Sequence, residues 1–504
     1  MANKESQTTI GVVSFTDPRD LALAEEAEGY LKESHNELVS YLEGKGYRVA
    51  DPHKLLKKTD GYFGVRSTRE IEGCIELLKQ EGAACLIIGC WKWTEPQLVL
   101  RLVKELNIPV LLFTRLDSRW SGATCLTAVG ASLWEGAPNR AALTHMRLAD
   151  RMEGILPWVE GVGALARMNR ASVMLFGGSY SLRMEHLQDD IPRLKSFLIG
   201  DILQSGEYPI ILRADELLKK SPRRIESFIK WLSDNKARII YDNKMMSSES
   251  FRKQVALYLA AKDLIAMDDP IIGISIKCQP HLSIHYGVDG CLIPAFMPFS
   301  EDAEGKKQII PTVCEGDIKG LLTSCILHQL NPEIPPLFGD LKYVNDDYFI
   351  IANCGAASVY YAANSCRACD VLPNITISAQ CQGSSGGAVH YRGRKCQVTV
   401  ARLIRIAGHY IMQLGLGKGR DVDDKIMSEM LWGRMWPHVA VDLGITASDL
   451  LEVAGSNHYS LTTGDITAEI THLCREAAIP VLRLDHKEEI ARFKAQLARQ
   501  AGWQ

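Results

Sequence analysis

The sequence predicts an α/β protein in which two doubly wound parallel-sheet domains precede a mixed C-terminal domain with antiparallel, barrel-like β structure. Three observations predict this fold class. Short apolar runs alternate with helical patterns in the first third of the chain, and the same alternation begins again near Ala171. A region rich in Thr, Ser, Gly and Val begins at Val371. Alternating strands and helices are typical of parallel sheets covered by helices, and clustered β-forming residues favour antiparallel strands.

The length of 504 residues indicates about three domains, at roughly 150 residues for each. We expect an N-terminal α/β domain at residues 1–170, a central α/β domain at 171–352 and a mixed β/α domain at 353–504. The composition is 46% hydrophobic and 23% charged. This ordinary balance predicts buried cores rather than disorder.

The hydrophobic patterns predict the individual elements of these domains. In the first domain, we expect helices at 20–44, 68–80 and 95–106, with strands at 9–15, 47–50, 84–90 and 108–113. In the second, we expect strands at 173–176, 208–212, 237–241, 271–276 and 309–313. In the third, strands are expected at 374–378 and 395–405, with a helix at 487–499. Ligands meet parallel sheets at the carboxyl ends of strands, so the loops 16–20 and 91–96 are candidate binding loops.

Charge and hydropathy exclude several classes of partner. The formal net charge of -3 gives no indication of a nucleic acid or an anionic membrane as partner. The polar N-terminus has no signal-peptide core, and the longest apolar runs have strand length rather than the roughly 20 residues of a membrane span. Fourteen scattered cysteines without an export signal predict reduced thiols, and we expect a cytoplasmic protein.

Two carboxylates lie where a predicted strand meets a helix. The strand 309–313 runs into Cys314, Glu315, Gly316 and Asp317, and an apolar helical pattern follows. In one interpretation, Asp317 caps the helix and Glu315 is solvated. In the other, a carboxylate at this strand end binds a metal or acts as an acid or base.

A second acid and a histidine lie further along the chain. Asp340 follows Gly339, and His458 lies in a Gly-Ser-Asn-His segment. In the alternative interpretation, Asp340 is a turn residue and His458 lies in a surface loop, without a role in chemistry. Carboxylates together with an imidazole suit a divalent ion such as Mn²⁺ or Mg²⁺. Spacing alone cannot bring three loops together, so the residues by themselves indicate only three plausible ligands.

Several motifs of the chain occur in the order found in the L-fucose isomerase family and, more distantly, in the L-arabinose isomerases. The chain resembles that family over most of its length, in the Gly177-Gly178 turn, the segment Cys314–Gly320, the pair Gly339-Asp340, the turn Asn353–Gly355, and the elements Trp436–His438 and Gly455–His458. The resemblance implies a metal-dependent aldose–ketose isomerase that works through an enediol.

By this resemblance, Glu315, Asp340 and His458 would bind Mn²⁺, with Mg²⁺ or Co²⁺ as alternatives, and Glu315 and Asp340 would share the proton transfers. A divalent ion that chelates two sugar oxygens lowers the cost of the enediolate charge. The resemblance also implies a homo-oligomer, a trimer or hexamer with active sites between subunits. The residues that it places against the sugar are Arg19, Trp91, Trp93, Gln279, Trp436 and Asn457.

The chain departs from the family pattern in places that bear on the substrate. It is shorter than typical L-fucose isomerases, the Gly177-Gly178 turn continues with Ser-Tyr-Ser-Leu, and the first domain lacks the Arg-Arg pair after its first strand. The sugar could therefore be similar to L-fucose or D-arabinose, or a modified hexose. An anionic sugar such as sulfoquinovose, isomerised to 6-deoxy-6-sulfofructose, is the alternative, with a sulfonate met by Arg19, Arg183, Lys277 or Arg434.

Two other functions stay open on the sequence. A non-catalytic sugar-binding or regulatory protein could also place two α/β lobes around a cleft, but it would not need two strand-end carboxylates and a histidine. A metal-dependent lyase or epimerase could use the same enediolate chemistry. Bound metal and the reaction product distinguish these functions from an isomerase.

Overall fold

The computed structural model describes residues 8–19, 24–56, 58, 60–136, 139–179, 181–267, 271–380, 385–430 and 436–500. The chain forms two compact units: unit 1 contains residues 1–167 and 471–478, and unit 2 contains residues 168–470 and 479–504. The predicted domain boundaries stay predictions. The first, at 170, falls close to the division between the units, and the second, at 352, falls within unit 2.

Unit 1 contains a five-stranded parallel sheet in the order β2-β1-β3-β4-β5. Its strands are β1 (Thr9–Ser14), β2 (Arg48–Ala50), β3 (Cys85–Gly89), β4 (Val110–Thr114) and β5 (Met146–Ala149). Its helices are α1 (Ala24–Gly44), α2 (Thr68–Gln80), α3 (Pro96–Leu106), α4 (Gly122–Gly136), α5 (Arg140–Thr144) and α6 (Ile155–Met168), which ends at the division. The chain returns to unit 1 in the second half of α16 (Thr467–Glu476).

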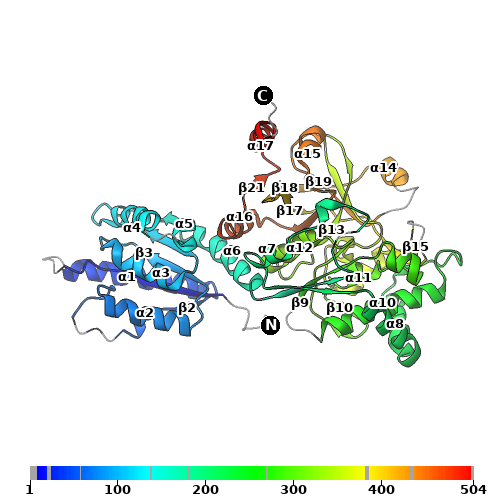
Figure 1. Ribbon diagram of the computed structural model, residues 1–504, viewed down its shortest axis with the longest axis horizontal. Coiled ribbons are helices and arrows are strands. Elements are labelled where there is room, and N and C mark those ends of the chain that lie inside the picture. The colour runs from blue at the N-terminus through cyan, green and yellow to red at the C-terminus, as the bar shows by residue number, and fades with distance from the viewer. Residues whose placement is uncertain are drawn as a thin grey trace. The chain divides into compact units, whose positions relative to one another are not determined.

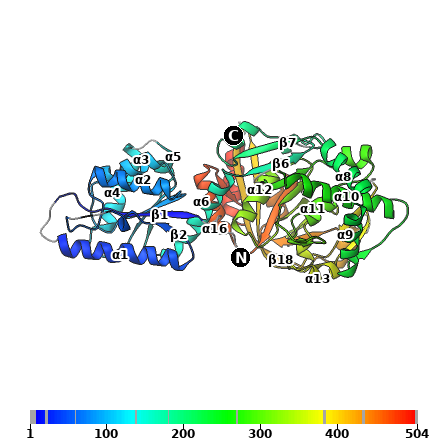
Figure 2. The ribbon, with the colours of Figure 1, turned by 90° about the horizontal axis from the view of Figure 1, so that it is seen from below.

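Helices cover both faces of this sheet, and its central strands β1, β3 and β4 are buried at every residue. One set of strand residues, including Val13 and Ile88, packs against α2, α3 and α4. The alternate set, including Val12 and Ile87, packs against α1 and α6. Figure 2 shows α1 on one side of β1 with α2 and α3 on the other. Strands buried on both faces are typical of a doubly wound parallel sheet.

Unit 2 contains a second parallel sheet, in the order β12-β9-β6-β7. Its strands are β6 (Ser172–Phe176), β7 (Asp201–Ser205), β9 (Ile271–Ile276) and β12 (Thr312–Cys314). The helices of this region are α7 (Ile191–Lys195), α8 (Tyr208–Lys220), α9 (Pro222–Asp234), α10 (Ser248–Ile265), α11 (Leu292–Phe296) and α12 (Ile318–Leu330). Ile274 and Ile276 pack with α8, α10 and α11, whereas Gly273 faces α12.

The rest of unit 2 is built on a six-stranded antiparallel barrel. Its strands run in the order β17-β20-β13-β14-β19-β18, and the pairing of β17 with β18 closes the barrel. The barrel strands are β13 (Leu337–Val344), β14 (Phe349–Ala352), β17 (Gln397–Ile406), β18 (His409–Arg420), β19 (His438–Asp442) and β20 (His458–Thr463), and β21 (Val481–Arg483) adds in parallel to β18. Closure leaves few unpaired strand edges.

Smaller elements complete unit 2. A three-stranded sheet contains β8 (Arg238–Ile239), β15 (Thr376–Ala379) and β16 (Gly387–His390), and a hairpin contains β10 (Glu301–Asp302) and β11 (Gly305–Lys306). The remaining α-helices are α13 (Ala368–Val371), α14 (Asp424–Glu429), α15 (Ala447–Val453) and α17 (Lys487–Gln500). Short 3-10 or π-helical turns in the chain are η2 (Pro52–Lys54), η3 (Met152–Gly154), η4 (Glu185–Leu187), η5 (His281–Tyr286), η6 (Val359–Ala362) and η7 (Leu372–Asn374).

Helix α12 lies between the parallel sheet of unit 2 and the barrel. It contacts β9 and β12 on one side and β17 and β20 on the other, and Figure 1 shows it beside β13 and β17. All residues from Ile318 to Leu327 are buried, which explains why its sequence is apolar on nearly every side. The first turn of α12 therefore brings the end of β12 next to the barrel strands.

The structure confirms the predicted fold class and corrects one predicted element. Residues 208–212 were expected to form a strand because Tyr-Pro-Ile-Ile-Leu is rich in β-forming residues, but they are the first turn of α8. Pro209 suits the start of a helix, where its missing N–H is not needed, and Arg-Ala-Asp-Glu-Leu-Leu continues the helix. Among the described residues, we find no helix both long and apolar enough to cross a membrane.

Candidate metal and active site

Glu315 occupies a sharp turn between β12 and α12. Its N–H donates to the carbonyl of Ile276 in the neighbouring strand β9 at 2.9 Å. Glu315 and Gly316 both adopt left-handed backbone conformations, with φ of 64° and 66°. A bulky residue in this region is strained by about 1–3 kcal/mol, and such strain concentrates at functional sites. The turn holds a glutamate at the carboxyl edge of the sheet, where its role as a metal ligand or acid–base group stays a prediction.

Asp340 and His458 come from adjacent barrel strands. The two residues stand directly opposite one another in the antiparallel pair β13–β20. Residues directly opposite in such a pair point to the same face of the sheet, with Cβ atoms about 5 Å apart. The closed barrel thus places a carboxylate and an imidazole side by side from residues that are far apart in the sequence.

The two carboxylates of the predicted metal site both approach Nε2 of His458, the third predicted ligand. Nε2 of His458 lies 3.1 Å from Oε2 of Glu315 and 3.5 Å from Oδ1 of Asp340. The His458 side chain is 1% exposed, whereas those of Glu315 and Asp340 are 19% and 36% exposed. The imidazole is therefore fixed in the interior, and both carboxylates can be reached by a ligand from outside.

The chemistry of this donor set fits a divalent cation. Ligand atoms around an octahedral ion with bonds of about 2.1 Å lie about 3 Å apart, close to the separations from Nε2 of His458. Two carboxylates and one imidazole suit ions between the hard and the borderline classes. The residues therefore fit an ion such as Mn²⁺, and they would leave coordination positions for substrate oxygens.

The charges of the site perturb two pKa values. Burial disfavours a charged His458, but hydrogen bonds to Asp317 and Glu315 outweigh it and raise the pKa of the imidazole to about 9. Burial, together with the charge of Glu315, raises the pKa of Asp340 above its usual range. A carboxyl group with a raised pKa is better suited to accept and return a proton near neutral pH.

Gln279 lies beside Glu315, and its contact with the sugar, which the resemblance implies, stays a prediction. It follows β9, and the two residues line one small cavity whose volume of about 10 Å³ suits one water-sized species. Oε1 of Gln279 accepts a hydrogen bond from Ser283 at 2.8 Å, and its main-chain carbonyl accepts one from Ser181 at 2.6 Å. Cys314 and Cys354, from two of the family-like motifs, also line the cavity, together with residues that the sequence did not indicate: Cys278, Asp289, Cys291 and Gln380.

Asn457 also lies at the site, but Trp436 is buried. The amide of Asn457 donates to Oδ1 of Asp340 at 2.8 Å, and its Oδ1 bonds to Nε2 of His186 at 2.8 Å. The sequence did not indicate His186. The Trp436 side chain packs in a core cluster with Ile350 and is only 4% exposed. Stacking of Trp436 on a sugar stays a prediction that would need the indole to become accessible.

Arg19 and Trp93 lie at the carboxyl edge of the unit 1 sheet, in the two loops that the sequence indicates. Arg19 is exposed and forms a two-point ion pair with Asp17, at 2.6 and 2.9 Å. Trp93 is half-buried, and its main-chain N–H donates to Oγ of Ser121 at 2.8 Å. Both side chains are exposed enough to contact a ligand, and their predicted contact with the sugar stays a prediction.

Trp91, in contrast, belongs to the core of unit 1. It is fully buried, and its Nε1 donates to Oγ of Ser14 at 2.8 Å. Ser14 is also bonded to two histidines, at 2.9 Å to Nδ1 of His35 and at 3.0 Å, through its N–H, to Nε2 of His53. Trp91 therefore has a packing role in this structure, and its contact with a sugar stays a prediction, whereas Trp93 in the same loop is more accessible.

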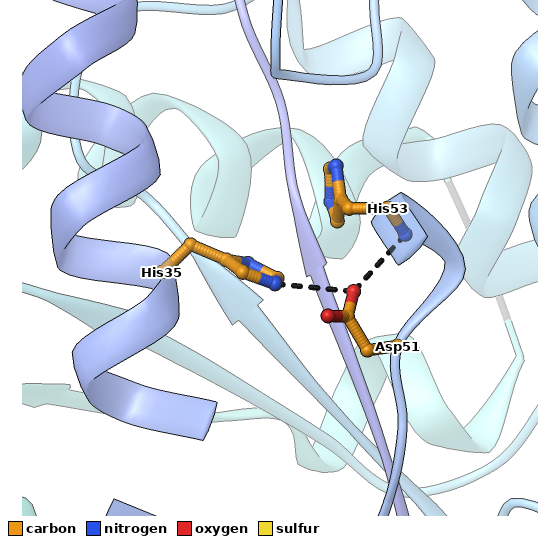
Figure 3. Close-up of side chains that lie close together, drawn as sticks. All are labelled: His35, Asp51 and His53. Carbon is orange, nitrogen blue, oxygen red and sulfur yellow. Dashed lines mark hydrogen bonds and ion pairs between the residues drawn. The ribbon is translucent and has the colours of Figure 1, made fainter. Parts of the chain in front are cut away.

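His35, Asp51 and His53 lie close together and have the composition of a metal site (Figure 3). The ring nitrogens of both histidines, however, already have hydrogen-bond partners. Nε2 of His35 lies 3.1 Å from Oδ1 of Asp51, and Nδ1 of His53 bonds to the carbonyl of Phe63 at 3.1 Å. A metal would have to displace these bonds and those to Ser14. We therefore interpret the cluster as a buried hydrogen-bond network that anchors the segment after β2 to the end of β1.

This network predicts that unit 1 loses stability in mild acid. Burial above all lowers the pKa of His53 from 6.5 to about 3, so between these values the unfolded chain binds a proton that the folded unit does not. The free energy of unfolding should therefore fall as the pH drops below about 6.5, by about 2 kcal/mol at pH 5. Urea unfolding between pH 5 and 8 measures this. His53→Gln should flatten the slope, and an unchanged slope in this variant would contradict the assignment.

Comparisons with known proteins relate part of the chain to one family of isomerases. Residues 351–485 match the family described as L-fucose isomerase, C-terminal domain. The chain is 22% identical to the sulfoquinovose isomerase of Alkalicoccus urumqiensis over 45% of its own length and 47% of the relative's. It is 25% identical to the sulfoquinovose isomerases of Priestia aryabhattai and Priestia megaterium over 40% of its length and 42% of theirs. The matched part of the chain thus spans less than half the length of these relatives.

A solved structure with a weak likeness is the periplasmic binding protein component of the arabinose ABC transporter from Shewanella sp. ANA-3. The likeness has 12% identity over 53% of this chain and 72% of that chain, and the TM-score of 0.14 is too low to support any inference. The family match, in contrast, confirms the resemblance to the L-fucose isomerase family: residues 351–485 are similar to the C-terminal domain of that family.

Proposed function

We propose that the chain is a metal-dependent aldose–ketose isomerase that interconverts its sugars through an enediol. The observation that carries this proposal is the convergence of Glu315 and Asp340 on Nε2 of His458. The family match and the names of the relatives support the isomerase class. A sugar-binding protein without catalysis would have no use for two accessible carboxylates against a buried imidazole.

Glu315, Asp340 and His458 would hold the ion, for which we propose Mn²⁺, with Mg²⁺ or Co²⁺ as alternatives. When bound, the ion supplies a Lewis acid that polarises the sugar carbonyl and stabilises the charge of the enediolate. The chain itself must move a proton between C1 and C2. Glu315 and Asp340 are the partly exposed carboxylates at the site, and the raised pKa of Asp340 suits such an exchange.

The substrate that we favour is sulfoquinovose, because the relatives carry that name. Neutral sugars such as L-fucose and D-arabinose are the second candidate, supported by the C-terminal domain match. Of the cations that the sequence offers for a sulfonate, Lys277 follows β9 at the same sheet edge as Glu315, and Arg183 is exposed in unit 2. Arg19 is paired with Asp17 in unit 1, and Arg434 lies outside the described residues.

Metal removal and a substrate panel test this function together. Dialysis against EDTA should lower turnover by about 10²-fold or more, and Mn²⁺ should restore it, because the polarising charge is lost and regained. Sulfoquinovose, L-fucose and D-arabinose are assayed side by side. Turnover of only the neutral sugars would refute the sulfonate assignment, and a protein that is inert with Mn²⁺ on every sugar would favour a binding protein.

Product analysis separates the remaining alternatives. An isomerase run in D₂O should give a ketose labelled at C1 or an aldose labelled at C2, as followed by NMR. A lyase would give fragments and an epimerase would give a second aldose. From the family resemblance we also propose a trimer or hexamer with sites between subunits, which light scattering on the purified protein tests.

A further inference from the structure

Asp317 is surrounded by hydrogen-bond donors from three elements. It caps α12, where Oδ1 accepts from the N–H of Gly320 at 2.8 Å. Arg402 of β17 binds both carboxylate oxygens, at 2.5 Å from Nη1 to Oδ2 and 3.1 Å from Nη2 to Oδ1. Nδ1 of His458 lies 2.8 Å from Oδ2. The side chains of Asp317 and Arg402 are both completely buried.

The local sequence makes room for this arrangement. A Cβ atom on Gly320 would lie 2.7 Å from Oδ2 of Asp317 and 2.8 Å from Nη1 of Arg402. Such approaches are closer than van der Waals contact allows, so the ion pair needs glycine at this position. Gly320 therefore serves the buried pair as well as the helix.

The contacts of His458 fix the direction of its ring. Nδ1 faces Asp317, and Nε2 consequently faces Glu315 and Asp340. A carboxylate only accepts hydrogen bonds, so in the neutral imidazole Asp317 favours the proton on Nδ1, which leaves the Nε2 lone pair for a metal. The Phe338 ring, 4.8 Å from the imidazole between centroids, packs against it.

We propose that the buried Asp317–Arg402 pair is a positioning unit for the metal site, which holds His458 with Nε2 directed at Glu315 and Asp340. The inference rests on the proposed function. Arg402 compensates the charge of Asp317 and orients both of its oxygens, so the pair adds no net charge beside the ion. The two partly exposed carboxylates then supply the charge that a divalent cation neutralises. Hydrogen-bond partners of this kind typically change metal affinity by about 10–100-fold.

The same helix offers a matched control. Asp189 is also completely buried and pairs with Lys319, in the first turn of α12, at 2.9 Å. It accepts further bonds from Arg405 at 2.6 Å and Tyr410 at 2.5 Å. Among the described residues, its contacts do not include His458. Asp189→Asn therefore damages a comparable buried ion pair without touching the imidazole.

The experiment compares Asp317→Asn with Asp189→Asn in the full chain. Titration calorimetry gives the dissociation constant for Mn²⁺. ¹⁵N NMR of the metal-free, histidine-labelled protein gives the tautomer of His458, and it is recorded above pH 9, where the imidazole is neutral. We expect Asp317→Asn to weaken Mn²⁺ binding about 10–100-fold and to change the His458 tautomer. Asp189→Asn should lower the melting temperature, but its dissociation constant for Mn²⁺ should stay within about twofold of the original protein and the tautomer of His458 should not change. A folded Asp317→Asn protein with unchanged affinity and tautomer would overturn the proposal.

Arg402→Lys decides the matter if Asp317→Asn does not fold. It keeps the charge but loses the two-point geometry, and we expect weaker Mn²⁺ binding together with a less uniform His458 tautomer. Unchanged values in this variant would overturn the proposal. If the unmodified protein binds no Mn²⁺, the proposed function fails, whereas the tautomer comparison still tests whether Asp317 orients His458.

Discussion

Glu315→Gln is expected to lower kcat by about 10³-fold with little effect on the melting temperature. The substitution keeps the size of the side chain but removes its charge, so it takes away a metal ligand and one of the two groups proposed to transfer the proton. General acid–base catalysis alone contributes about 10²–10⁴-fold. The side chain is partly exposed at the edge of the sheet, and its backbone turn would be unchanged.

The assay uses saturating Mn²⁺ and whichever sugar the panel identifies. Glu333→Gln is the matched control, because Glu333 is an exposed glutamate outside the site, and it should retain the original activity. Measured metal content distinguishes the two roles of Glu315: a protein that retains Mn²⁺ but not turnover assigns it to proton transfer, and loss of both assigns it to metal binding. Activity within tenfold of the original would remove Glu315 from the proposed mechanism.

The sequence could identify the ligands only through the context in which each lies. Glu315, Asp340 and His458 could each be an ordinary turn or loop residue. Their spacing in the sequence does not predict that the end of β12 lies close to β13 and β20. The structure joins them because α12 packs between sheet and barrel, and because Asp340 and His458 share one register position. Long-range pairing of this kind has no local signature in the chain.

Asp317 and Arg402 show more clearly how much of the site could not be predicted from the sequence. The sequence indicated that Asp317 caps a helix, which is correct but incomplete, since the same carboxylate also binds His458 and Arg402. The sequence contains one indication of Arg402, because this arginine lies within the mostly apolar segment Val398–Ile404 of a predicted strand. A buried charge needs a partner, so this residue could have prompted a search for a buried acid. Its partner, 85 positions away, could not be chosen from sequence alone.

Arg402→Met is expected to lower the free energy of unfolding of unit 2 by about 3–5 kcal/mol. Methionine fills much of the space, but Asp317 then keeps a buried charge with only the Gly320 N–H and His458 to compensate it. Breaking one side of a buried ion pair typically has this cost, whereas replacing both partners is far milder. Urea unfolding of the metal-free protein, fitted with one transition for each compact unit, measures the loss without a contribution from bound ion.

The double variant Asp317→Asn with Arg402→Met tests the reason for this loss. If the uncompensated charge causes it, the double variant should be about 0.5–3 kcal/mol more stable than the sum of the single effects predicts. Arg420→Met is the control, because Arg420 pairs with Asp442 while 52% exposed, and such surface pairs contribute about 0–1 kcal/mol. Additive single effects, or a loss in Arg402→Met no larger than in Arg420→Met, would mean that the buried pair is not electrostatically coupled. The stability of the barrel and the orientation of His458 would then depend on packing around Phe338 and α12 instead.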